Sequence, residues 1–77
     1  MEIPSKSNPR WSEIVTGKKT YQLKFLAAKI LLGRLVASVQ SDASQANIAS
    51  CAEQLHGLYT KNAGSPSAQE DLKTIFG

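Results

Sequence analysis

Apolar residues recur three or four positions apart in four segments of the chain, which is the spacing of one helix face. No segment shows, beyond chance length, the alternation of apolar and polar residues that is typical of a strand. The four segments cover residues 9–16, 23–40, 45–62 and 68–76. Because the breaks between them are short, neighbouring helices are expected to run antiparallel. The pattern predicts an all-α fold, a compact bundle of three to four helices.

The first predicted helix has recognisable ends. Asn8 is a favourable N-cap, and Pro9 suits the first helical position, where its missing N–H costs nothing. Gly17 is placed to end the helix in the left-handed conformation. Residues 1–7 are polar and contain Pro4, so we expect them to form a loosely ordered lead-in.

The second predicted helix is long and apolar. Thr20 is its expected N-cap, and its body extends from Leu23 to about Gln40. On a helical wheel it carries two apolar stripes on roughly opposite sides. The wider stripe consists of Phe25, Ala28, Leu32, Leu35, Val36 and Val39, and the second consists of Leu23, Leu26, Ala27 and Ile30. A helix that is apolar on two sides is expected to lie at the centre of the bundle.

The last two predicted helices are set apart by polar breaks. The polar segment 41–44 precedes the third helix, and Gly64 follows its end. The apolar stripe of the third helix consists of Ile48, Cys51, Ala52, Leu55, Leu58 and Tyr59. Ser67 and Glu70 have the spacing of a capping box, which predicts the start of the fourth helix at Ser67. Asp71 is expected to add favourable negative charge at that end.

Length and charge place limits on function. The 77 residues form a single domain, 1–77, with a thin hydrophobic core that self-association would enlarge. Residues 1–40 contain seven lysines and arginines against two acidic residues, whereas residues 41–77 contain two against four. This split indicates either a basic face for an anionic partner or attraction between the two halves, within one chain or between two copies.

The sequence favours a cytoplasmic protein with no membrane association. Cys51 is the single cysteine, so no disulfide forms within the chain. The residues before Pro9 lack the apolar stretch of a signal peptide. Lys24, Lys29 and Arg34 interrupt the apolar second helix, which makes it a poor membrane span. In this setting Cys51 is interpreted as a small buried core residue.

No segment carries a catalytic, metal or nucleotide signature, so the sequence predicts neither an enzyme nor a cofactor. Residues 16–20 echo the end of a phosphate-binding loop, but Ser12 stands where that motif needs its first glycine. The lysines there are interpreted as a solvated turn, with weak anion attraction at a helix N-terminus as the alternative. Glu53 and His56 match one Glu-x-x-His step of a di-iron bundle, and the other ligands of such a site are missing. We interpret them as a surface glutamate beside a boundary histidine.

The residues expected to contact a partner combine aromatic, arginine and loop character near the start of the second helix. They are Arg10, Trp11, Lys18, Lys19 and Tyr21. Tryptophan and arginine are enriched in the energetically dominant positions of interfaces. For the Trp11 side chain itself a core position is the favoured alternative, because Trp11, Ile14 and Val15 share helical spacing and small domains need their large aromatics inside.

Three functions remain open from the sequence. The first is a small protein–protein interaction module, acting as a regulator, adaptor or subunit through a protein partner or as a homodimer. The alternative is a nucleic-acid-binding module, with Trp11 and Tyr21 available to stack on bases. Its basic residues would be Arg10, Lys18, Lys19, Lys24, Lys29 and Arg34. The third is a metal-binding protein that uses Glu53 and His56 in an oligomer.

Overall fold

A computed structural model describes residues 2–77 of the chain. Within that range it contains four helices and no strand, so the predicted all-α class is confirmed. The helices are α1 (Pro9–Val15), α2 (Leu26–Ser41), α3 (Gln45–Lys61) and α4 (Pro66–Phe76). They form a compact body of 33 × 22 × 20 Å.

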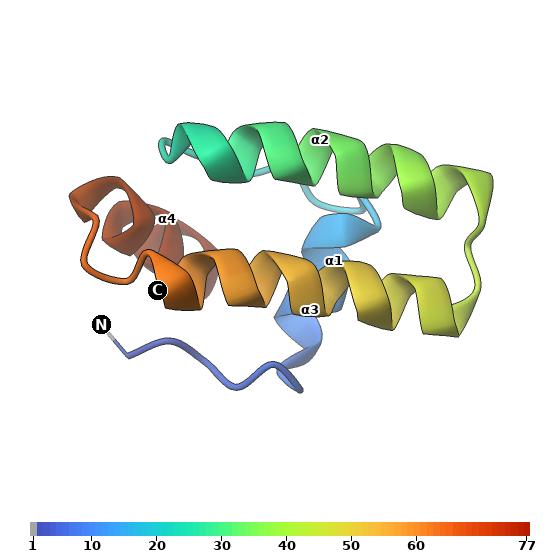
Figure 1. The fold of residues 1–77 in the computed structure, drawn as a ribbon, viewed down its shortest axis with the longest axis horizontal. Helices are drawn as coiled ribbons and strands as arrows, with labels where there is room; N and C mark the ends of the chain where they lie inside the picture. Colours follow the sequence, from blue (N-terminus) through green and yellow to red (C-terminus); the bar gives the residue numbers. More distant parts are fainter. Residues whose placement is uncertain (1) are drawn as a thin grey trace.

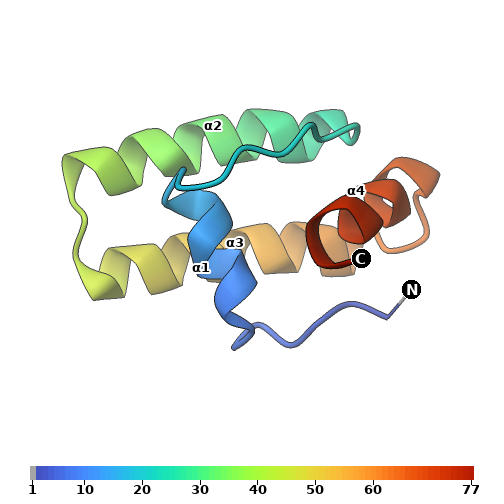
Figure 2. The same cartoon turned by 180° about the vertical axis from the view of Figure 1, so that it is seen from behind.

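The two long helices, α2 and α3, form an antiparallel hairpin, and the two short helices pack beside it. In Figure 1 the hairpin helices lie one above the other and are joined at one end by the short segment 42–44. Figure 2 shows α1 crossing the hairpin, while α4 lies at the end away from that segment. The chain between α1 and α2 runs along α2 on the side of α1. This connecting segment, residues 18–25, forms part of the site described below.

The two ends of α1 are those predicted from the sequence. The Asn8 side chain accepts a hydrogen bond from the Arg10 N–H at 2.9 Å, as an N-cap does. Gly17 follows the helix with a φ of 70°, and its N–H donates to the Ile14 carbonyl at 3.1 Å. A Cβ atom at Gly17 would make an ordinary van der Waals contact with Val36 at 3.4 Å, so the positive φ is what favours glycine here.

The start of α2 differs from the prediction. The helix begins at Leu26 after the N-cap Phe25, so the expected start at Leu23 with Thr20 as cap is wrong. Residues 18–25 are not helical. Leu23 is buried in the core, at 6% exposure, although it lies outside the helix. Tertiary burial therefore overrides the helical propensity of this stretch.

Asp71 of α4 holds the chain in its extended form before α2. Its carboxylate accepts hydrogen bonds from the backbone N–H groups of Lys24 at 2.6 Å and Phe25 at 3.1 Å. It also accepts the hydroxyl of Tyr59 in α3 at 2.9 Å. Asp71 is the only buried charged or polar residue among residues 2–77, and these hydrogen bonds offset its loss of hydration. Its role is this link between α3, α4 and α2, rather than the expected one at the start of α4.

The wider apolar stripe of α2 is partly buried, whereas the members of the second stripe that lie in the helix are exposed. From the wider stripe, Ala28, Leu35 and Val39 are at most 5% exposed. From the second stripe, Leu26 is 65% exposed and Ile30 is 57% exposed. The expected central position of this helix is therefore not confirmed. Instead α2 has a free outer side, and α3 packs against both α1 and α2.

The predicted stripe of α3 faces the core. The helix starts after Ser44, whose hydroxyl accepts the Asn47 N–H at 3.1 Å. The buried members of the stripe are Cys51, Ala52, Leu55 and Tyr59. Cys51 is a free thiol at 2% exposure, so its interpretation as a core residue is confirmed.

The fourth helix starts earlier than predicted. It begins at Pro66 after the N-cap Ser65, so the capping box of Ser67 and Glu70 is wrong. Proline at the first helical position explains the earlier start, because its fixed φ suits the first turn. Glu70 instead forms an ion pair with Lys24, with 3.4 Å between the ammonium nitrogen and the carboxylate oxygen.

The segment before α1 contains no helix, yet it contacts the core. The indole N–H of Trp11 donates to the Ser5 carbonyl at 3.1 Å. Ile3 is partly buried and packs against the core. Met1, the first residue of the expected lead-in, lies outside the described residues. Residues 2–7 are thus irregular in form and attached to α1 by the indole.

Tyr59 is expected to make the fold sensitive to alkaline pH. Burial, followed by the hydrogen bond to Asp71 and its charge, raises the pKa of Tyr59 above the ordinary value of 10.0. The folded protein therefore holds the phenol proton more tightly than the unfolded chain. This contribution to stability is complete below the unfolded pKa of 10.0 and is lost as the pH rises above it.

We expect the free energy of unfolding to fall above that pH, and Tyr59 to ionise only when the protein unfolds. Urea unfolding at rising pH, with phenolate absorbance recorded in parallel, measures both effects. Tyr59→Phe should show a smaller alkaline decline, since Tyr21 is then the only tyrosine. An equal decline in the two proteins would contradict the prediction.

Candidate functional site

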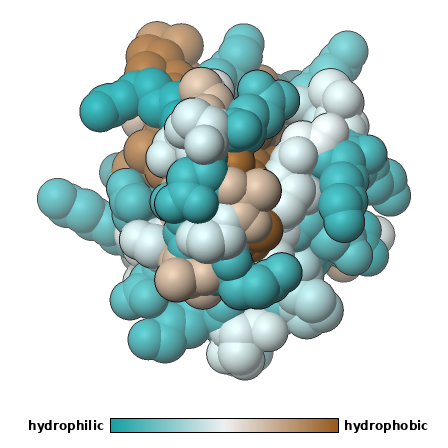
Figure 3. Space-filling view, turned by 90° about the vertical axis from the view of Figure 1, so that its right-hand side faces the viewer, coloured by the Kyte–Doolittle hydropathy of each residue, from teal (hydrophilic) through white to brown (hydrophobic). Residues whose placement is uncertain are grey.

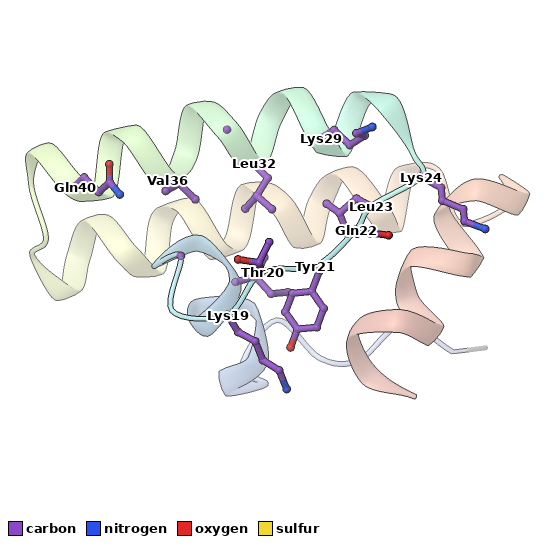
Figure 4. Close-up of a pocket in the computed structure, with 13 residues that line it drawn as sticks. Lys19, Thr20, Tyr21, Gln22, Leu23, Lys24, Lys29, Leu32, Val36 and Gln40 are labelled. Carbon is purple, nitrogen blue, oxygen red and sulfur yellow. The ribbon is translucent and has the colours of Figure 1, made fainter.

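A groove of about 810 Å³ lies between α2 and the connecting segment. Figure 4 shows this segment crossing in front of the hairpin, with α2 above it and α1 below. A volume of this size falls within the range of about 300–1,000 Å³ that is usual for ligand sites. We therefore take the groove as the candidate functional site.

One face of α2 forms a wall of the groove. It contributes five residues at helical spacing, namely Lys29, Leu32, Gly33, Val36 and Gln40. Leu32 and Val36 are half-buried and point from α2 toward the connecting segment, which makes the floor apolar (Figure 4). Gly33 leaves room in this wall, because a Cβ atom there would meet no atom within 4 Å.

The connecting segment forms the opposite wall, and the core holds it in place. Its groove residues run from Lys19 to Lys24. Within them, Leu23 is inserted into the core. The hydrogen bonds from Lys24 and Phe25 to Asp71 fix the end of the segment. This wall therefore depends on tertiary contacts rather than on regular secondary structure.

The charged residues that line the groove are all basic. They are Lys19, Lys24 and Lys29. Lys24 forms the ion pair with Glu70, which is exposed and therefore contributes little to stability. Within residues 2–77 no ion pair involves Lys19 or Lys29. The groove thus combines an apolar floor with a positively charged rim.

Three of the five residues predicted to contact a partner lie together, and the side chains of Lys19 and Tyr21 point from the connecting segment away from α2 (Figure 4). The Arg10 guanidinium donates to the Tyr21 hydroxyl at 3.2 Å and to the Ile75 carbonyl at 3.4 Å. It also pairs with Glu13 at 3.7 Å. The Lys19 ammonium lies 5.7 Å from the centre of the Tyr21 ring, a cation–π distance. The hydrogen bond to Tyr21 is the largest cause that raises the pKa of Arg10, so this residue stays charged.

Tyr21 and Lys19 line the groove, whereas Arg10 is not a lining residue and contacts Tyr21. Lys18 is exposed in the turn after α1 and is not among the lining residues. Because α2 starts only at Leu26, the turn that carries Lys18 is not at a helix N-terminus. The alternative of anion attraction by a helix end therefore does not apply to it.

Trp11, which was predicted to contact a partner, does not lie on the surface. Its side chain is fully buried, so the core interpretation is confirmed. The ring centre of Trp11 lies 4.7 Å from that of Phe76, 5.4 Å from that of His56 and 5.9 Å from that of Tyr59. Because the indole is fully buried among these rings, no part of it is accessible to a partner. A small domain needs its large aromatic residues in the core.

Beside the groove, the outer side of α2 exposes apolar residues. Leu26 and Ile30 are four positions apart, and Gly33 and Ala37 continue the same row along the helix. We call these four residues the outer row of α2. In Figure 3, hydrophobic atoms gather at the upper edge of a mostly hydrophilic face, at the level of α2. Gly33 belongs both to the outer row and to the groove, so the two surfaces are continuous.

Sequence reasoning missed Leu32, Gly33 and Val36 as site residues. The helical wheel placed Leu32 and Val36 in the stripe expected to be buried, and the structure leaves both half-exposed at the groove. The available signal was Gly33, since a glycine inside a helix costs about 1 kcal/mol relative to alanine and often has a packing or functional reason.

Glu53 and His56 do not form a metal site in the described chain. Glu53 is exposed and pairs with Lys6 at 3.8 Å, and His56 packs edge-on against Trp11. Nowhere in residues 2–77 do three or more His, Cys, Asp or Glu side chains come close enough to hold a metal ion. The interpretation as a surface glutamate beside a boundary histidine is confirmed.

Neither a search for membrane-spanning helices nor a comparison with known proteins identifies a function. None of the helices in residues 2–77 has the length and apolar content needed to cross a bilayer. Comparison with known proteins gives no match, whether to a protein-family model, a curated protein or a solved structure.

Proposed function

We propose that the protein is a small helical interaction module that binds another protein at the groove and the outer row of α2, with no catalytic activity of its own. The observation that carries this proposal is the continuity of an 810 Å³ groove with the exposed side chains of Leu26 and Ile30. Covering apolar surface contributes about 25 cal/mol per Å². A cytoplasmic location, where Cys51 stays reduced, is part of the proposal.

Nucleic acid is the second candidate, because the exposed cations Lys18, Lys19, Lys29 and Arg34 suit a phosphate backbone. Stacking on bases has less support. Trp11 is buried, and Tyr21 is half-buried with its hydroxyl bonded to Arg10. An apolar partner surface fits the groove floor better than a polyanion does.

Site-specific photo-cross-linking in cells tests the proposal. A photoreactive phenylalanine analogue replaces Ile30 in one variant and Gln40 in another, and Gly57 on the far side of α3 in the control. Ile30 and Gln40 are exposed at the proposed surface, and a Cβ at Gly57 meets no atom within 4 Å, so all three variants should fold. We expect both surface positions to yield adducts with the same identified protein, and position 57 to yield none of it.

Adducts of equal amount and identity at all three positions would contradict the proposal, because they would report non-specific collisions. Adducts with nucleic acid alone at Ile30 and Gln40 would support the second candidate instead. Light scattering of the purified chain completes the test. A homodimer whose cross-links join two copies at Ile30 would retain the interaction function with the protein as its own partner.

A further inference from the structure

We infer that the groove and the outer row of α2 bind an amphipathic helix of another protein whose flanking positions are acidic. This inference rests on the proposed function and specifies the chemistry of the partner. Recognition of an apolar helix face by a groove is a common mode of peptide binding.

The outer side of α2 has the shape that a partner helix needs. The outer row gives one straight line of contacts along the helix, with Leu26 and Ile30 at one end and Gly33 and Ala37 at the other. The two small residues allow a second helix backbone to approach closely, within the usual interaxial distance of about 8–10 Å. From Leu26 to Gln40 the surface is about 21 Å long, which matches about 14 residues of helix.

The groove beside this row gives the partner a place for side chains. A helix lying on the outer row would direct the residues on one of its edges over Leu32 and Val36, the apolar floor. The gap above Gly33 connects the row to the floor. The interface would therefore be an apolar line of contact along the outer row, which we call the seam. On one side of the seam, partner side chains would enter the groove.

The charges around the seam are uniformly basic. α2 contains Lys29 and Arg34 and no acidic residue. Lys19 of the connecting segment points away from α2 (Figure 4), so the cations beside the outer row are Lys29 and Arg34. The nearby Glu70 is already paired with Lys24. Acidic side chains on a partner would face these cations, which favours complexes with that partner and raises the rate of encounter.

The same charges argue against a second copy of this chain as the occupant. Two copies packed antiparallel through α2 would cross near Gly33 and place Arg34 of one copy close to Arg34 of the other. Lys29 would find no acidic residue to pair with on the other α2, because that helix has none. Like charges that face each other across an interface oppose association.

Two designed peptides of about 14 residues test the inference, since that length spans α2 from Leu26 to Gln40. Both carry leucine at helical spacing, and the flanking positions are glutamate in one and lysine in the other. Fluorescence anisotropy measures their binding to the full chain. We expect the glutamate peptide to bind about tenfold more tightly at low salt, and the difference to shrink as salt is added.

A matched pair of glycine variants locates the site. Gly33→Glu places an acidic side chain in the groove wall, whereas Gly57→Glu makes the same change in charge and helix propensity on α3. Neither Cβ meets an atom within 4 Å, so both variants should fold, as circular dichroism will check. We expect Gly33→Glu to weaken the affinity for the glutamate peptide about tenfold. Gly57→Glu should change that affinity less than about twofold.

Equal affinity for the two peptides, or equal effects of the two glycine variants, would overturn the inference. Tighter binding of single-stranded DNA or of phosphatidylserine vesicles, weakened by Gly33→Glu, would overturn it in favour of another anionic partner. A dimer in light scattering that Gly33→Glu dissociates would overturn it in favour of a second copy. If cross-links from Ile30 and Gln40 identify a protein but the glutamate peptide does not bind, the partner chemistry is wrong and the proposed function stands. If no protein is cross-linked and the glutamate peptide does not bind, both the proposed function and this inference are wrong.

Discussion

Replacing Asp71 with alanine is expected to lower the free energy of unfolding by about 3 kcal/mol. The change removes the acceptor of the Tyr59 hydroxyl and of the backbone N–H groups of Lys24 and Phe25. Tyr59 is fully buried, so its hydroxyl cannot exchange the lost bond for water without disturbing the core. In a domain of this size the loss corresponds to a fall in Tm of roughly 12–24 °C. Thermal and urea unfolding followed by circular dichroism measure it.

Two milder variants separate the contacts of Asp71. Asp71→Asn keeps one oxygen acceptor and the shape of the side chain, so a smaller loss is expected than for alanine. Tyr59→Phe removes only the hydroxyl that donates to Asp71, and it should lower the free energy of unfolding by about 1 kcal/mol. If Asp71→Ala lowered stability by less than about 1 kcal/mol, the carboxylate would contribute no more than an exposed one, contrary to the prediction.

The Asp71 variant is also expected to loosen the site. The connecting segment is fixed at its end by Asp71, and residues of this segment form one wall of the groove. Amide hydrogen exchange should therefore rise in residues 20–25 of folded Asp71→Ala more than in the middle of α3. A uniform rise across the chain would mean that the variant lowers only global stability.

Replacing Trp11 with alanine is expected to destabilise the protein by about 3–5 kcal/mol, the range for deleting a buried large aromatic. Trp11 is fully buried against the rings of Phe76, His56 and Tyr59, which come from α3 and α4. Its indole also holds the segment before α1 through Ser5. Since a domain of this length has a total stability of about 4–12 kcal/mol, this loss is a large share of it, and Trp11→Ala should unfold at a much lower temperature and urea concentration.

Trp11→Phe and Lys18→Ala are the matched controls for this prediction. The phenylalanine keeps an aromatic ring in the core but loses the hydrogen bond to Ser5, so its effect should be intermediate. Lys18 is exposed in the turn after α1, so Lys18→Ala should change the free energy of unfolding by less than about 0.5 kcal/mol. Urea unfolding followed by far-ultraviolet circular dichroism compares the three variants. Equal stability of Trp11→Ala and Lys18→Ala would contradict the burial of Trp11.

Local signals in the sequence were sufficient for the number of helices and for several of their ends. The side-chain cap of Asn8, the left-handed Gly17 and a cap within the polar segment 41–44 act within four residues of the groups they bind. Their effects are properties of the local chain, so they can be predicted without knowledge of the fold. The core positions of Trp11 and Cys51 followed from helical spacing in the same way.

The candidate site could be predicted only in part, because its walls come from distant segments. Lys19 and Tyr21 were identified from residue type and lie in the groove. Leu32 and Val36 were assigned to the core, since helical spacing shows that residues share a face and does not show whether that face is covered. No local pattern predicts that the chain before α2 lies beside them.

The sequence by itself determined the all-α class, the four helical segments and the uneven distribution of charge, because each depends on spacing and composition along the chain. Only the tertiary structure decided where α2 begins, which of its stripes is buried and where a groove forms. The start of α2 is held by Asp71, which lies 46 and 47 positions from the backbone groups it binds. That contact, together with the burial of Leu23, overrides the helical propensity of residues 23–25. Leu26 and Ile30 are exposed because no other helix of residues 2–77 covers their side of α2.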